Sequence, residues 1–97
     1  MSNYQFQTTF WSDFSIADVF GKQAIKDTFN RAFKEWKDNH VYLTELAIVT
    51  NWKCWDFYHA GKHDISQMYA DYYYKCREYA LDHYKGKELA YYLDFTD

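Results

Sequence analysis

The stretch that decides the fold is MYADYYYKCREYALDHY, residues 68–84, in which six of the seventeen positions are tyrosine. Residues at alternating spacings of four and three form one seam: Ile65, Tyr69, Tyr72, Cys76, Tyr79 and His83. Such a seam is typical of a helix that packs against other helices. Tyr73 flanks the seam, while Tyr74 and Tyr84 are the rings that we expect at the surface. A buried tyrosine needs a hydroxyl partner, so we expect the seam rings at the edge of the core, with their tips in water.

The length and composition favour one folded unit. A chain of 97 residues can close one core and is too short for two, so we predict a single helical domain, residues 1–97. Aromatic residues make up 24% of the chain and hydrophobic residues 48%, which excludes the composition of a disordered protein. The net charge of -3 gives no general attraction to nucleic acid or to anionic lipid.

Two further features concern the compartment. The start of the chain, MSNYQFQTTFWSDF, lacks the basic and apolar regions of a secretory signal, so we expect a cytoplasmic protein. The longest apolar-rich stretch, residues 41–58, is interrupted by Glu45, Asn51, Lys53 and Asp56, so we expect no membrane span. In a helical hairpin that turns near Lys62, Cys54 and Cys76 would lie roughly 9 Å apart along the axis, which favours two buried thiols over a disulfide.

The hydrophobic pattern predicts three main helices. The first follows Gly21 and runs to about Lys37, because Ile25, Phe29, Ala32, Phe33 and Trp36 recur at helical spacing. The second runs from about Val41 to Tyr58, with Asp38 or Asn39 as its cap. Its apolar residues surround the helix, which predicts a central position. Gly61 separates it from the third, which Asp64 would cap.

The two ends of the chain are predicted separately. FSIADV, residues 14–19, predicts a short leading helix, with Ser15 as cap, Asp18 in a box-like position and Phe14 stapled onto Val19. NYQFQTTFW, residues 3–11, and YYLDFTD, residues 91–97, alternate and could pair as strands. Leu89, Tyr92 and Leu93 fit a continued helix equally well. The fold class is mostly α: a three-helix bundle with a short N-terminal helix and, as an open alternative, a two-stranded pairing of the termini.

Four blocks carry a resemblance to a known family: TTFWSDFSIADVFG, AIKDTFNRAFKEWK, YLTELAIVTNWK and KGKELAYYLDFTD. With them the chain resembles a family of short, uncharacterised domain-of-unknown-function proteins. These occur in gut Gram-positive bacteria and in their phages or mobile elements. The resemblance spans essentially the whole chain and implies a cytoplasmic bacterial or phage-related protein. It implies no chemistry and brings no functional residues with it.

Nucleic-acid binding is the alternative function that the sequence offers. SIADVFGKQAIKDTF, residues 15–29, looks like the front of a helix-turn-helix. In that register, however, Lys22, Asp27 and Asn30 would face the core, at a cost of several kcal/mol for a buried, unpaired charge. A stripe of lysines on the long first helix could contact phosphates: Lys22, Lys26, Lys34 and Lys37. The charges on that helix can equally form ordinary pairs four residues apart, so we do not expect a nucleic-acid partner.

Catalytic and metal-binding signals are weak. DFYHAGKHD, residues 56–64, places Asp56, His59, His63 and Asp64 close together, but Gly61 interrupts the helix and separates the two histidines. The sequence contains no glycine-rich phosphate loop, nucleophile elbow or metallopeptidase signature. We therefore expect no enzyme, no cofactor and no metal.

The abundance of rings favours a binding surface. Four tryptophans, eight phenylalanines and eleven tyrosines exceed what one core of this size can hide. Exposed tyrosine and tryptophan are enriched at protein interfaces. We predict a non-enzymatic accessory module with a protein partner or a homo-oligomeric state. Its surface would contain the rings that fall off the main seams: Trp11, Trp55, Tyr74, Tyr91 and Tyr92.

Overall fold

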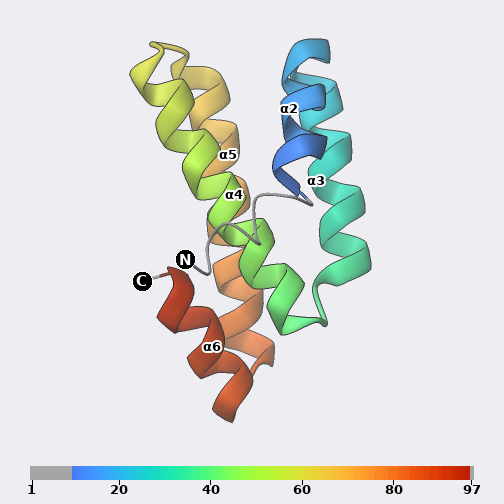
Figure 1. The fold of residues 1–97 in the computed structure, drawn as a ribbon, viewed down its shortest axis with the longest axis vertical. Helices are drawn as coiled ribbons and strands as arrows, with labels where there is room; N and C mark the ends of the chain where they lie inside the picture. The colour runs from blue at the N-terminus through green and yellow to red at the C-terminus, as the bar shows by residue number, and fades with distance from the viewer. Residues whose placement is uncertain (1–9, 97) are drawn as a thin grey trace.

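The computed structural model describes residues 10–96, which form five helices (Figure 1): α2 (Phe10–Phe20), α3 (Lys22–Trp36), α4 (His40–His59), α5 (His63–His83) and α6 (Gly86–Thr96). The prediction of a mostly helical protein is confirmed. The count of three main helices is wrong, because the leading helix begins at Phe10 and the C-terminal segment adds a helix of its own.

The pairing of the termini as strands is not supported. Residues 91–96 lie in α6, and the residues of the N-terminal segment before Phe10 lie outside the described part of the chain. The helical alternative holds because Leu89, Tyr92 and Leu93, at spacings of three and one, all contact the buried core when the segment is a helix.

Helix α4 is the centre of the fold. Its residues from Leu43 through Thr50 are all buried, which confirms the central position that the sequence predicts. Helix α5 packs along α4 as the second arm of a hairpin, and the α2–α3 hairpin packs on another side of α4 (Figure 1). Among residues 10–96, α6 contacts α4 and α5 and neither of the first two helices. No helix in this part of the chain has both the length and the apolar character needed to cross a membrane.

The turns explain where the helices begin. Gly21 alone separates α2 from α3 and has a φ of 111°, a conformation that residues with a Cβ rarely adopt. Asn39 caps α4 as predicted, since its side-chain oxygen accepts hydrogen bonds from the backbone of Val41 and Tyr42 at 3.1 and 3.2 Å. Asp64 does not cap α5. That helix begins one residue earlier, at His63, so Asp64 lies in the first turn.

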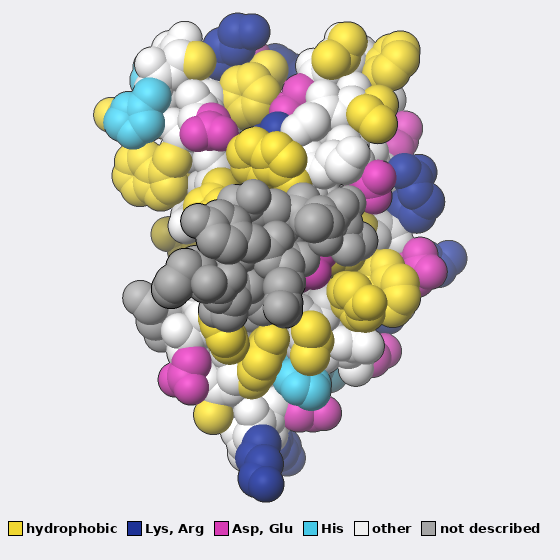
Figure 2. Space-filling view, viewed as in Figure 1, with side chains coloured by type: hydrophobic (Ala, Val, Ile, Leu, Met, Phe, Trp, Pro, Cys, Tyr) yellow, Lys and Arg dark blue, Asp and Glu magenta, His cyan; other side chains and the backbone are white. Residues whose placement is uncertain are grey.

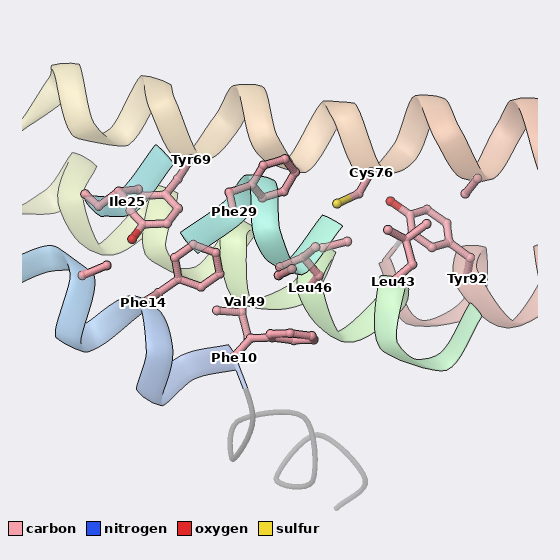
Figure 3. Close-up of a cluster of buried hydrophobic side chains, with 14 of the residues drawn as sticks. Phe10, Phe14, Ile25, Phe29, Leu43, Leu46, Val49, Tyr69, Cys76 and Tyr92 are labelled. Atoms are coloured by element: carbon pink, nitrogen blue, oxygen red, sulfur yellow. The ribbon is translucent and has the colours of Figure 1, made fainter. Parts of the chain in front are cut away.

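The predicted seam of α5 faces the core in part. Tyr69 and Cys76 are fully buried (Figure 3). Tyr72 and Tyr79 are half-buried against the same cluster. Phe29 stacks on Tyr72 with 4.3 Å between ring centroids, which joins α3 to α5. His83 is exposed at the end of the seam, where the helix ends. Aromatic packing therefore holds α5 against its neighbours.

Tyrosine hydroxyls in and beside α5 bond to protein groups. For fully buried Tyr69 this corrects the expectation that the seam tips lie in water, whereas the Tyr79 hydroxyl bond is exposed at the rim. Tyr69 donates to an Asp18 carboxylate oxygen at 2.5 Å, and Tyr79 donates to Asp38. Tyr73 donates to the carbonyl of Thr96 at 3.2 Å. Tyr84, predicted to be exposed, is buried instead. It lies beyond the end of α5 in an extended conformation that turns its hydroxyl to the carbonyl of Lys37, at 2.5 Å.

The two cysteines are free, as the sequence predicts, but only Cys76 is buried as expected. Cys76 is fully buried, and desolvation raises the pKa of its thiol well above the ordinary value. Cys54 is half-buried, with its sulfur 3.5 Å from the Ser66 hydroxyl oxygen.

This difference predicts unequal thiol reactivity. At mildly alkaline pH, a disulfide reagent such as 5,5′-dithiobis(2-nitrobenzoate) should modify Cys54 first, while Cys76 should react only as the protein unfolds, because a buried neutral thiol is a poor nucleophile. Stopped-flow absorbance on Cys54→Ser and Cys76→Ser variants separates the two rates. Fast modification of Cys76 in the folded Cys54→Ser variant would contradict its burial.

Candidate interaction surface

A buried polar cluster joins α2 to α4 and α5. The ammonium nitrogen of Lys53 lies 2.8 Å from Asp18 Oδ2 and 2.9 Å from Ser15 Oγ, and it sits 4.2 Å from the ring centroid of Trp11. The Tyr69 hydroxyl donates a hydrogen bond to the other carboxylate oxygen of Asp18. The Asp18 hydrogen bond, together with burial, raises the pKa of Tyr69 far above its ordinary value, with burial as the larger cause.

This cluster corrects the predicted roles of Ser15 and Asp18. Because α2 begins five residues before Ser15, both residues lie inside the helix, on one face at a spacing of three, where their oxygens meet Lys53. The predicted staple between Phe14 and Val19 is also wrong, since Phe14 is fully buried and Val19 is exposed. Ser15 and Asp18 therefore attach α2 to α4 through Lys53 instead of capping a helix.

The Lys53 cluster is structural in its geometry. A lysine ammonium has three N–H donors, and here Ser15 and Asp18 take two of them while the Trp11 ring covers the group. The Lys53 side chain is buried, so a substrate has no approach to the amine.

The five predicted surface rings do not form one patch. Trp55 is 53% exposed and packs against Tyr58, and Tyr74 is 62% exposed on a different helix. The other three lie elsewhere: Trp11 over Lys53, half-buried Tyr91 against His40, and Tyr92 fully buried. Tyr92 is therefore wrongly assigned to a surface, because its position on α6 turns the ring into the core.

The four lysines of the predicted stripe lie on α3 and at its C-terminal end, and two of them have carboxylate neighbours. Lys22 forms an ion pair with Asp64, and Lys37 lies 3.9 Å from an Asp38 oxygen. Lys26 and Lys34 are exposed. Two of the four lysines thus lie beside carboxylates, which reduces the positive charge that the stripe offers to phosphates. The nucleic-acid alternative stays a prediction.

The histidine-rich turn has a different arrangement from a metal site. His63 packs edge-on against Tyr58, with 5.2 Å between centroids, and Asp64 is paired with Lys22. Within residues 10–96, no three His, Cys, Asp or Glu side chains come close enough together to hold a metal ion.

The two most exposed of the large apolar side chains in residues 10–96, Val19 and Phe20, lie on α2 close to a third, Ile16. Val19 is 81% exposed, Phe20 77% and Ile16 59%, and their spacing of three and four puts them on one side of the helix. Figure 2 shows hydrophobic side chains clustered at the end of the α2–α3 hairpin, at the upper right. Sequence reasoning missed this site. The available signal was a second apolar stripe on α2, beside the buried stripe of Phe10, Phe14 and Ala17.

An open groove of about 530 Å³ adjoins these side chains, between α2 and α3. Small residues form its floor, Ala17, Ala24 and Thr28, and charged residues of both signs form its rim, Asp13, Asp27 and Arg31. We call the surface made by the groove and the exposed apolar residues the α2–α3 face; it comprises Asp13, Ile16, Ala17, Val19, Phe20, Ala24, Asp27, Thr28 and Arg31.

Comparison with known proteins gives no relative for this chain, since no family model, curated protein or solved structure matches it. The resemblance to the bacterial family stays an expectation from sequence. Function is therefore argued from the geometry of the surface.

Proposed function

We propose that this protein is a non-enzymatic interaction module that self-associates through the α2–α3 face. The observation that carries the proposal is the exposure of Ile16, Val19 and Phe20 side by side on one helix. Contiguous exposed apolar side chains rimmed by polar residues mark interaction sites on soluble proteins. The proposal agrees with the expectation from the sequence that an aromatic-rich chain of this size presents part of its apolar surface to a partner.

A second copy is the occupant that the face fits. Phe20 and Ile16 form a ridge beside a trough floored by Ala17 and Ala24, so the ridge of one copy can enter the trough of the other. A two-fold axis repeats every contact, and the rim carries Arg31 together with Asp13 and Asp27, so groups of opposite charge are available for pairing between the copies. The resulting interface would be a four-helix bundle of two hairpins.

The energetics predict a weak dimer. Burying each of the three apolar side chains contributes about 1–2 kcal/mol after allowing for their present exposure, so six of them contribute on the order of 10 kcal/mol. Association costs about 4–15 kcal/mol of translational, rotational and side-chain freedom. Because the net gain is at most about 8 kcal/mol, which corresponds to a micromolar dissociation constant, we expect a weak monomer–dimer equilibrium, micromolar at its tightest, rather than an obligate dimer.

Sedimentation velocity tests the proposal. Phe20→Asp should raise the dimer dissociation constant about 100-fold, because each of the two symmetric copies loses roughly 1.4 kcal/mol or more of apolar burial. The side chain is exposed, so circular dichroism should show an unchanged helix content. Tyr74→Asp, on the exposed side of α5, serves as the matched control and should leave the equilibrium as it is.

Two results would contradict the proposal. A wild-type chain that stays monomeric to millimolar concentration does not self-associate. A dimer that survives Phe20→Asp but dissociates in Tyr74→Asp uses another surface.

A further inference from the structure

A second groove lies between α4 and α5, on a different part of the molecule from the α2–α3 face. Its volume is about 380 Å³, within the range of small-ligand sites. Residues of both helices line it, and we call it the α4–α5 groove: Cys54, Trp55, Tyr58, His63, Ser66, Gln67 and Ala70. The floor is fixed, because Ser66 donates a hydrogen bond to the carbonyl of Cys54 at 2.8 Å.

Three rings form the wall of this groove. Trp55 and Tyr58 stand at 81° with centroids 5.7 Å apart, and Tyr58 and His63 stand at 82° with centroids 5.2 Å apart. Trp55 and Tyr58 are each about half exposed, so ring surface remains available to a ligand. The rings make a corner in which the edge of one ring meets the face of the next, and Trp55 also stacks on His59 with centroids 6.1 Å apart. The exposed half of Trp55 and of Tyr58 is the ring surface that can attract a cation.

The nearest carboxylate tied to the groove lies just outside its lining. Gln67 lines the groove and donates from Nε2 to Asp71 Oδ1 at 2.8 Å, which places an exposed carboxylate one helical turn along α5 from Gln67. This bond uses one of the two carboxylate oxygens. The nearby carboxylate of Asp64 is paired with Lys22, so these two charges cancel. The chain as a whole carries a net charge of -3.

The same protein already places its own cations on ring faces. Lys53 sits 4.2 Å from the Trp11 ring centroid, and Lys75 sits 5.2 Å from that of Phe33. These contacts are internal, whereas the corner of Trp55 and Tyr58 opens outward. A cation from another molecule can make the equivalent contact there.

We propose that the α4–α5 groove binds the guanidinium group of an arginine side chain on a partner protein. A guanidinium is planar, is more weakly hydrated than an ammonium and stacks on aromatic faces, so it suits an apolar, half-open corner better than lysine does. Its fork of N–H donors can reach the Gln67 side-chain oxygen and the Asp71 carboxylate. The proposal does not depend on self-association, because the two surfaces share no residue.

The test uses a charge-matched series of small probes. Nα-acetyl-arginine amide is titrated into the ¹⁵N-labelled protein at mildly alkaline pH. Nα-acetyl-citrulline amide, which has nearly the same shape without the charge, and Nα-acetyl-lysine amide are the comparisons. The readout is the indole Nε1–H signal of Trp55, assigned with Trp55→Phe. The arginine probe should shift this signal with millimolar affinity, at least tenfold more tightly than citrulline and several-fold more tightly than lysine.

Variants test the two recognition elements separately. Trp55→Leu should weaken arginine binding at least tenfold, here followed by the backbone signals of Gln67 and Ala70, and Asp71→Asn should weaken it about fivefold. Tyr74→Leu, an exposed ring outside the groove, is the control and should bind normally. Equal binding of arginine and citrulline would overturn the recognition of charge. Equal binding of arginine and lysine would overturn the choice of guanidinium. An unchanged Trp55 indole signal at the highest soluble concentration of the arginine probe would overturn the site.

Discussion

Lys53→Met is expected to lower the free energy of unfolding by about 3–5 kcal/mol, because it leaves the Asp18 carboxylate in a buried site without its counter-charge. The methionine fills a similar volume, so the loss reports the charge rather than a cavity. The Trp11 ring also loses the cation that it covers. Urea denaturation followed by circular dichroism measures the change.

Two further variants separate this effect from a general loss of lysine. Lys34→Met, on the exposed side of α3, should change stability by no more than about 0.5 kcal/mol. Adding Asp18→Asn to Lys53→Met should recover most of the loss, since asparagine still accepts the Tyr69 hydroxyl and carries no charge. A Lys53→Met protein as stable as wild type would show that the pair contributes nothing.

Tyr92→Ala is expected to lower the free energy of unfolding by about 3–5 kcal/mol, as other truncations of large aromatic residues in a core do. Tyr92 is fully buried in the same cluster as Leu43 and Cys76, and Figure 3 shows its ring beside Leu43. Removing it opens a cavity at the contact between α6 and α4. Thermal or urea unfolding gives the magnitude.

Tyr74→Ala is the matched control for Tyr92→Ala, since the same substitution is made at a ring that is mostly exposed. It should change the free energy of unfolding by no more than about 0.5 kcal/mol. Similar losses in the two variants would contradict the burial that distinguishes them.

The parts of the fold that sequence predicts well are those with local signals. Helix α3 has one clear apolar stripe, and Asn39 marks the start of α4 by a cap that acts within three residues. The central place of α4 is also predicted from a local signal, since nearly every turn of this helix carries apolar residues on more than one side.

The buried Lys53 cluster and the exposed surface of α2 could not be predicted in the same way. The Lys53 cluster joins residues 35, 38 and 51 positions apart, and no local spacing reveals such contacts. Assigning surface rings as those left over from the helical seams fails for Tyr92, which belongs to the seam of another helix. The exposed stripe of α2 could not be recognised from the sequence, because a short helix with two apolar stripes looks like a helix with one broad core-facing side. Only the tertiary structure shows which stripe is buried.

The hydroxyl bonds of α5 and of Tyr84, the residue that follows it, determine how the helices align. A helix with rings at almost every turn presents much the same surface after a slip of one turn, about 5.4 Å, so shape alone specifies its sliding position poorly. Tyr69, Tyr73, Tyr79 and Tyr84 each donate to one partner, and these partners lie on α2, on α6 and in the turn after α3. A one-turn slip would break all four bonds together. The rings thus supply bulk, and the oxygen at the tip of each selects a single alignment among several of similar fit.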